Sequence, residues 1–284
     1  MMRALVCSLL IAVQAAGGDW MTLPAYRKTV LANGVTLLLM ERHGTPIINL
    51  NLALRSGSIL DPKGREGLSD LANDLLRKGT RSRTAGEIAE QLDFIGAELS
   101  TIADLETTRV RLEFLKKDLP EALDLFSDLI LNPVFPEDEV AKLLSQRADQ
   151  LKAEKDSPSQ VLGRYYKQFL FGAHPYGRPP GGTEESVMRI ERDDLARFHA
   201  RAYVSSNMVI AAAGDFSTDD LEARLRERFG SLPAKGIAAP AAPAPRRLDG
   251  DRLLLVDQPD ATQTYFAIGD IGIPIDHPDR VAIN

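Results

Sequence analysis

The stretch GLSDLANDLLRKGT, residues 67–80, decides how the rest of the chain is interpreted. Its apolar residues recur at spacings of three and four, the period of an amphipathic helix: Leu68, Leu71, Leu75 and Leu76. We therefore predict a helix from Gly67 to Lys78. Asp70 and Asp74 lie four positions apart, so this helix presents two carboxylates on one face, one turn from each other.

The segments before this helix have the pattern of β-strands. Residues 26–31 and 35–40 flank Asn33-Gly34, which is the strongest short-range signal for a β-hairpin. A third strand is predicted for residues 47–54. Residues 107–115 alternate between apolar and polar side chains, so they form a half-buried strand with Arg109 and Arg111 on its outer face.

Most of the remaining chain is helical by its apolar period. The predicted helices cover residues 85–95, 119–130, 137–153, 160–170, 193–203 and 219–229, and a strand is predicted at 208–213. Thr84 and Glu87 form a capping box for the first of these helices, and Gly96 ends it. Strands and helices occur in blocks, which indicates an α+β fold.

Composition excludes several classes of protein. The 284 residues are 44% hydrophobic and 26% charged, the balance of a soluble globular protein and not of a disordered or collagen-like chain. The net charge of -6, with basic and acidic residues interleaved, argues against nucleic-acid binding. Cys7 is the only cysteine, which excludes a disulfide framework and a cysteine zinc site in the folded part.

The N-terminus has the pattern of a secretory signal at residues 1–16. A basic Arg3 precedes an apolar run at 4–13, and small residues follow it as a cleavage site. The alternative is a buried first helix, but the run stops at Gly17-Gly18. The run is also too short for a membrane span, because it has about half the roughly 20 residues that a span requires. We therefore expect a secreted or periplasmic protein without a membrane span at this end.

Several markers occur in the order found in pitrilysin/insulinase-type (inverzincin) zinc metallopeptidases, and from Tyr26 to its end the chain resembles that family. They are the Asn33-Gly34 hairpin, RSGS at 55–58, the 67–80 stretch, HPYGRP at 174–179, Y-x-x-x-N-M at 203–208, G-D-F at 214–216, and Gln263-Thr264 with Gly269. The resemblance implies a half-shell domain in which helices pack an antiparallel-rich sheet, followed by the truncated start of a second, similar repeat.

In that family the corresponding helix carries H-x-x-E-H, in which two histidines bind zinc and the glutamate activates the bound water. Asp70, Asn73 and Asp74 occupy those three positions here. The family's third ligand position falls on Gln150, or on Asp149. The resemblance therefore implies that the zinc ligands and the general base are replaced, which leaves no catalytic residue and no zinc cofactor.

Two interpretations of Asp70 and Asp74 remain open at this stage. They are either polar residues on the outer face of the helix or part of a site for a hard cation such as Mg²⁺ or Ca²⁺. The four histidines, His43, His174, His199 and His277, have no helical spacing to one another, so they predict no relocated zinc site. The stretch PPGGT at 179–183 lacks the lysine of a phosphate loop, so we interpret it as a turn.

The predicted organisation is a signal at 1–16, a peptidase-family domain at 20–232, a Pro/Ala linker at 233–247 and the start of a second repeat at 248–284, with strands at 252–256 and 264–268. The resemblance implies a non-catalytic subunit that pairs with a homologue carrying an intact H-x-x-E-H motif, the two enclosing peptide substrates. Peptides add to exposed strand edges in this family, so Arg109 and Arg111 are candidates for peptide contact. The alternatives are a structural or binding protein without a proteolytic role, or a metallopeptidase with an Asp-based metal site.

Overall fold

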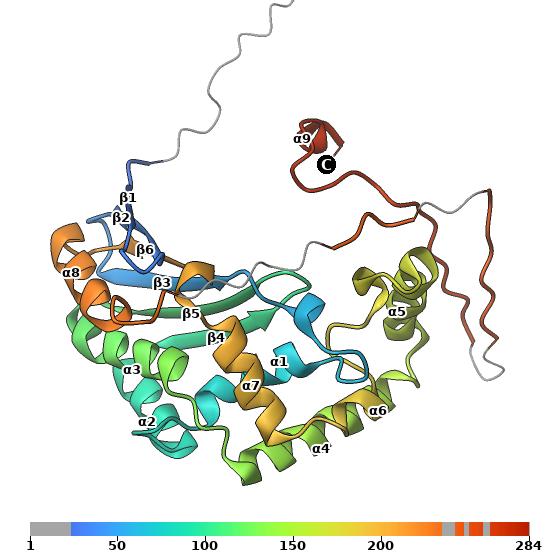
Figure 1. Cartoon of the computed structure of the whole chain (residues 1–284), viewed down its shortest axis with the longest axis horizontal. Helices are drawn as coiled ribbons and strands as arrows, with labels where there is room; N and C mark the ends of the chain where they lie inside the picture. The colour runs from blue at the N-terminus through green and yellow to red at the C-terminus, as the bar shows by residue number, and fades with distance from the viewer. Residues whose placement is uncertain (1–23, 235–241, 247–249, 258–261, 284) are drawn as a thin grey trace, which may run out of the picture.

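The computed structural model describes residues 24–234, 242–246, 250–257 and 262–283 (Figure 1). Its centre is one mixed sheet of six strands in the order β1-β2-β6-β3-β5-β4. The strands are β1 (Arg27–Val30), β2 (Thr36–Glu41), β3 (Ile47–Leu54), β4 (Glu98–Ala103), β5 (Thr108–Leu115) and β6 (Met208–Gly214). Only β2 and β6 pair in parallel, which confirms the antiparallel-rich α+β prediction.

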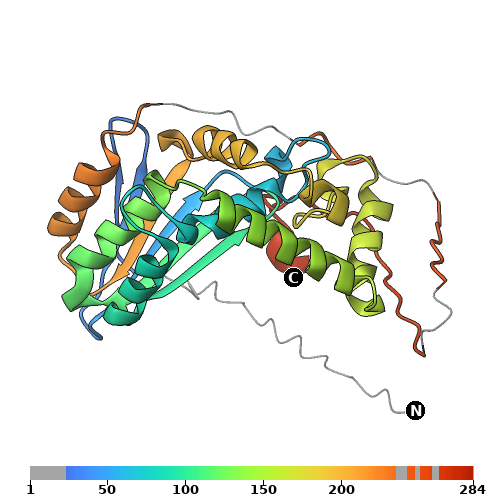
Figure 2. The same cartoon turned by 90° about the horizontal axis from the view of Figure 1, so that it is seen from below.

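Most of the helices lie on one face of this sheet (Figures 1 and 2). The longer ones are α2 (Ala85–Ile95), α3 (Leu119–Leu131), α4 (Glu137–Glu154), α5 (Pro158–Phe171), α7 (Arg192–Ala202) and α8 (Thr218–Phe229). Shorter helices are α1 (Leu68–Asp74), continued by a 3₁₀ turn at Leu75–Lys78, α6 (Glu184–Val187) and α9 (Arg280–Ile283). The 67–78 prediction is therefore confirmed as a helix whose last turn tightens. Helices α5 and α9 lie apart from the sheet.

Period-2 alternation places the core between the sheet and the helices. Alternate side chains of two interior strands are at most 1% exposed: Leu37 and Leu39 on β2, and Ile48, Leu50, Leu52 and Leu54 on β3. The apolar faces of α3 and α8 cover them with the buried Phe126 and Phe229. The alternate positions point to the opposite face of the sheet, where Asn49 and Asn51 are half-buried.

The predicted caps hold in detail. The Thr84 side chain accepts from the backbone N–H of Glu87, and the Glu87 carboxylate accepts from the backbone N–H of Thr84 at 2.8 Å. Gly96 ends α2 with a left-handed φ of 59°. Strand β4, which begins two residues after Gly96, was not predicted and forms the edge of the sheet beside β5.

The predicted strands at 252–256 and 264–268 are wrong. Within the described ranges 250–257 and 262–283 there is no strand, and α9 is the one regular element. The apolar side chains there are exposed, for example Leu253 at 88% and Ile268 at 90%. A strand exists through its pairing with a neighbour, and the described part of the chain offers these segments none. The predicted signal at 1–16 lies outside the described residues.

Candidate functional site

The start of α1 is held by a buried carboxylate and by a close backbone contact. The backbone N–H groups of Gly67 and Ser69 each donate to Asp61 at 2.9 Å, which satisfies donors that the first turn of a helix leaves free. Burial raises the pKa of Asp61 to about 7. Gly67 has a φ of +97°, and a Cβ there would lie 2.9 Å from the carbonyl oxygen of Gly181.

That contact identifies the role of the PPGGT stretch. It forms a turn that packs over the start of α1, and Thr183 then caps α6 through the backbone N–H of Ser186 at 3.1 Å. Gly182 has a φ of +78° and lies so close to Glu66 that a Cβ would be 2.2 Å from its carbonyl oxygen. The prediction of a turn at 179–183 is confirmed.

Helix α4 contributes the residue that organises the polar face of α1. The Arg147 guanidinium donates from Nη2 to Asp74 at 2.9 Å and from Nη1 to Asp70. The side chain of Arg147 is 14% exposed, and those of Asp70 and Asp74 are 24% and 35% exposed. One cation therefore bridges the two carboxylates that the resemblance assigns to zinc-ligand positions.

The electrostatics of this cluster are those of a partly buried ion pair with one surplus acid. Burial and the charge of Asp70 raise the pKa of Asp74, and the charges of Arg147 and Arg77 only partly offset them. Burial lowers the pKa of Arg147, but the hydrogen bond and charge of Asp70 outweigh it, so the guanidinium stays protonated. Thr101 on β4 reaches Asp74 at 3.5 Å, so the cluster borders the edge strand.

Asn73, which the resemblance assigns to the position of the general base, lies on a neighbouring, buried face of α1. Its side chain is 1% exposed, and Tyr203, the residue after α7, donates its hydroxyl hydrogen to Asn73 Oδ1 at 3.4 Å. Tyr203 stacks on His199 at a centroid distance of 4.3 Å. Burial lowers the pKa of His199 to about 4, so its neutral ring donates from Nε2 to the carbonyl of Ile130 at 2.8 Å. An amide in this setting cannot accept a proton from water.

Gln150 and Asp149 do not join the cluster. Both are exposed on α4, and the Gln150 amide donates to Glu154 at 3.4 Å. Arg147, one turn earlier on α4, takes the place opposite Asp70 and Asp74. Sequence reasoning missed Arg147, and its position three residues before Gln150, on the same side of a helix, was the available signal.

These residues do not fit zinc. The oxygens of Asp70 and Asp74 are held by a guanidinium, and a permanently protonated group cannot share a position with a metal ion. In the described part of the chain, no three His, Cys, Asp or Glu side chains are grouped so as to hold a metal. The histidines lie apart, with His43 on Asp215 and Glu41, His174 on the carbonyl of Pro243, and His277 at the backbone N–H of Asp279.

The structure also places the candidate peptide contacts. Arg109 and Arg111 lie on the exposed face of β5 and bond to Asp104 and Glu113 at 2.7 and 2.6 Å. Strand β5 pairs with β3 and β4, so a peptide cannot add to its edge. Contact with a peptide through these two side chains stays a prediction. Of the described helices, none has the length and apolar composition needed to cross a membrane.

Comparison with known proteins agrees with this geometry. Residues 36–184 match the family model "Insulinase (Peptidase family M16)", and residues 189–284 match "Peptidase M16 inactive domain". An uncharacterized zinc protease of Mycobacterium leprae is 36% identical over 204 residues, which cover 72% of this chain and 46% of that protein. The non-peptidase homolog YmxG of Helicobacter pylori is 30% identical over 200 residues, covering 70% and 46%.

Solved structures show the same fold. The peptidase M16 inactive domain of Pseudomonas fluorescens superposes with a TM-score of 0.74 at 29% identity, over 78% of this chain and 54% of that one. The first half of the periplasmic protease PqqL of Escherichia coli gives 0.68 at 19% identity, over 77% and 49%. This chain spans about half the length of the curated relatives it matches. The order of markers, the fold and the matched models agree, and the chain belongs to the insulinase family of peptidases, family M16.

Proposed function

We propose that this chain is a non-catalytic subunit that pairs with a zinc-bearing homologue, so that the two together enclose and bind peptides for proteolysis. The observation that carries the proposal is the Arg147 guanidinium between Asp70 and Asp74, the two residues that the resemblance assigns to the family's metal-ligand positions. The ion pair ties α4 to α1 without a metal, and Asn73 supplies no base. The domain frame is therefore kept while the hydrolytic chemistry must come from elsewhere.

The geometry next to this cluster suits peptide binding. Strand β4 is an edge of the sheet, so its outer backbone groups are unpaired within the described part of the chain and can accept an added strand. Thr101 of β4 contacts Asp74, so a peptide added here would pass beside the ion cluster. Its side chains would meet one guanidinium and two carboxylates instead of a metal-bound water.

The names of relatives are compatible with both halves of the proposal. YmxG of Helicobacter pylori is called a non-peptidase homolog, and PqqL of Escherichia coli is called a periplasmic protease. The signal pattern at 1–16 supports export, and we propose a secreted or periplasmic location for this chain.

Co-purification with a homologue from the same genome that carries an intact H-x-x-E-H helix tests the proposal. We expect a stable complex that cleaves peptides, with activity lost on chelation and absent from either chain alone. A complex in which the homologue's motif glutamate is changed to glutamine is the control, and it should bind peptide without cleaving it. Activity of the homologue that is unchanged by this chain would overturn the proposal.

A structural or binding protein without a proteolytic role is the second candidate, favoured by the absence of a metal-ligand set among the described residues. It predicts a stable assembly that contains this chain and has no peptidase activity under any zinc supply. The third hypothesis, a metallopeptidase working through Asp70 and Asp74, loses its support because Arg147 occupies both carboxylates.

A further inference from the structure

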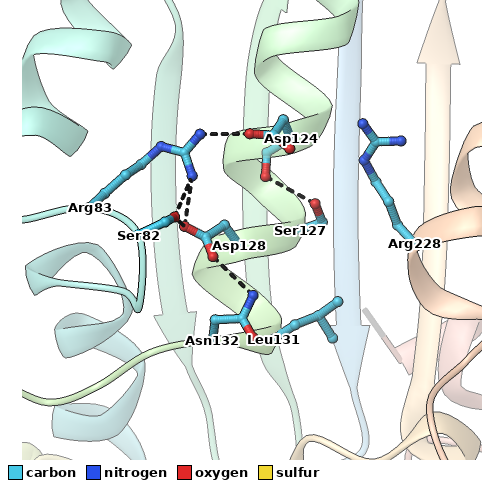
Figure 3. A pocket seen from close by; sticks show the side chains of 8 residues that line it. All are labelled: Ser82, Arg83, Asp124, Ser127, Asp128, Leu131, Asn132 and Arg228. Atoms are coloured by element: carbon cyan, nitrogen blue, oxygen red, sulfur yellow. Dashed lines mark hydrogen bonds and ion pairs between the residues drawn. The ribbon is translucent and has the colours of Figure 1, made fainter.

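A second polar site lies between α3 and α8, and none of the residues that line it belongs to the Arg147 cluster. A groove of about 420 Å³ opens there, within the range of small-ligand pockets (Figure 3). The residues that matter on its walls are Arg83, Asp124, Ser127, Asp128 and Asn132 on one side and Arg228 on the other. They come from three separate parts of the chain: the loop before α2, helix α3 and helix α8.

One wall is built as a fixed network. Asp128 accepts from Thr80 at 2.6 Å, from Ser82 at 2.7 Å and from Arg83 at 2.7 Å through one oxygen, and from Asn132 at 2.9 Å through the other. These bonds lower the pKa of Asp128 against the effect of its burial. The wall is therefore rigid and ionised before any ligand arrives.

Two groups on this wall keep free acceptor capacity. Asp124 is 56% exposed and uses only Oδ2, which accepts from Arg83 at 2.6 Å. Its Oδ1 has no hydrogen-bond partner among the residues that the structure describes. The Ser127 hydroxyl donates to the carbonyl of Asp124 at 2.9 Å and can accept one more bond.

The opposite wall supplies an uncommitted donor. Arg228 is 23% exposed, and across the described ranges its one ion pair is with Glu227, at 3.9 Å. A guanidinium has five N–H donors in a planar fork that matches a carboxylate. No hydrogen bond of Arg228 to another described residue uses them. Figure 3 shows this side chain facing the groove across from Asp124 and Ser127.

The charges in the groove cancel, which selects the kind of ligand. Arg83 and Arg228 are positive, and Asp124 and Asp128 are negative, so a simple anion or cation gains little. A ligand with a carboxylate at one end and an ammonium at the other matches both walls. We propose that the α3/α8 groove binds a zwitterionic amino acid or short peptide, with its carboxylate on Arg228 and its ammonium on Asp124 Oδ1.

This site is independent of the proposed pairing with a catalytic homologue. It shares no residue with Asp70, Asp74 or Arg147, and it requires no zinc. Its ligand class coincides with the products of peptide hydrolysis, so a chain that binds it would sense or retain such products. Failure of the pairing experiment leaves this proposal intact, and the reverse also holds.

Titration calorimetry on the full chain tests the proposal with glycine, glycylglycine and triglycine as probes. We expect saturable binding of at least one probe with a dissociation constant below about 1 mM. N-acetylglycine methylamide, which has a peptide group but no charged end, should not bind. The Arg228→Gln and Asp124→Asn variants should each weaken binding at least about tenfold.

Arg226→Gln is the matched control, because Arg226 lies on the same helix and pairs with Glu222 outside the groove at 2.8 Å. It should bind the probe as the unmodified chain does, and melting curves should show that all three variants are folded. Absence of binding by every probe at about 10 mM overturns the proposal. So does equal binding by the uncharged probe, or unchanged affinity in Arg228→Gln.

Discussion

Replacing Arg147 by methionine isolates the physical role of the ion cluster on α1. Methionine keeps the aliphatic packing of the arginine stem but leaves Asp70 and Asp74 facing each other one turn apart without a counter-ion. Exposed ion pairs contribute about 0–1 kcal/mol, and removing one partner of a fully buried pair costs about 3–5 kcal/mol. These side chains are 14–35% exposed, so we expect a loss of about 2–3 kcal/mol in the free energy of unfolding.

The loss should depend on pH with a defined sign. The pKa of Asp74 is already raised in the folded chain, and removing Arg147 raises it further. The folded variant then binds a proton that the unfolded variant releases, so its stability deficit shrinks as the pH falls from 8 to 5. Adding Asp70→Asn and Asp74→Asn to Arg147→Met removes all three charges and should recover at least half of the lost stability.

Urea unfolding of the full chain at pH 5 and pH 8 measures both effects. Arg224→Met is the control, because Arg224 forms an exposed pair with Asp220 at 2.9 Å, and we expect a change within about 0.5 kcal/mol. If Arg147→Met falls within about 0.5 kcal/mol of the unmodified chain at both pH values, the cluster has no stabilising role. The explanation for the survival of α1 without metal would then be refuted.

Three further predictions concern the same frame. The melting temperature should be equal in chelator and in one equivalent of zinc, because no described donor set fits the ion; a zinc-dependent rise would contradict this. The pKa of Asp61 is about 7 in the folded chain and exceeds the unfolded value, so this carboxyl lowers the free energy of unfolding by about 2–3 kcal/mol as the pH rises from 5 to 8. Asp61→Asn should remove that decrease. An unchanged dependence of the urea-unfolding free energy on pH would count against the prediction. Gly182→Ala should lower the free energy of unfolding by at least about 2 kcal/mol, because the new Cβ meets a backbone carbonyl. Gly163→Ala on α5 is the control: a Cβ there has no atom within 4 Å, so this change should be neutral or stabilising. Thermal melts of the two variants test the difference.

The fold was predictable where a local rule and the tertiary structure agree. The hairpin at Asn33-Gly34 and the cap at Thr84 depend on neighbours in sequence, and both are found where predicted. Strand β4 was missed because Glu98–Ala103 has no clean alternation and becomes a strand only by pairing with β5. Residues 252–256 have strong strand propensity but no partner strand in the described part of the chain, so they form no strand. In both cases pairing with a neighbour decides the outcome, and local propensity does not.

The sequence predicted the residues at the zinc-motif positions but not the residue that pairs with them. The resemblance assigned Asp70, Asn73 and Asp74 to the zinc-motif positions, and this needed no tertiary information because one helix carries all three. Arg147 lies 73 residues after Asp74, and its spacing of three residues from Gln150 was the one signal that the sequence offered for it. The packing of α4 against α1 decides which of its polar residues meets the carboxylates, and that packing is a property of the whole core.

The two faces of α1 hold the helix in the domain in different ways. Its apolar face, with Leu71 and Leu75 at most 1% exposed, packs into the core regardless of what the polar face carries. Asp70 and Asp74 repel each other on the polar face, and the Arg147 guanidinium offsets that repulsion. Arginine suits this task better than lysine, since its planar fork reaches both carboxylates at once and stays protonated when partly buried. Arg147 on α4 thus supplies the counter-charge that Asp70 and Asp74 require, and α1 stays in place without a metal.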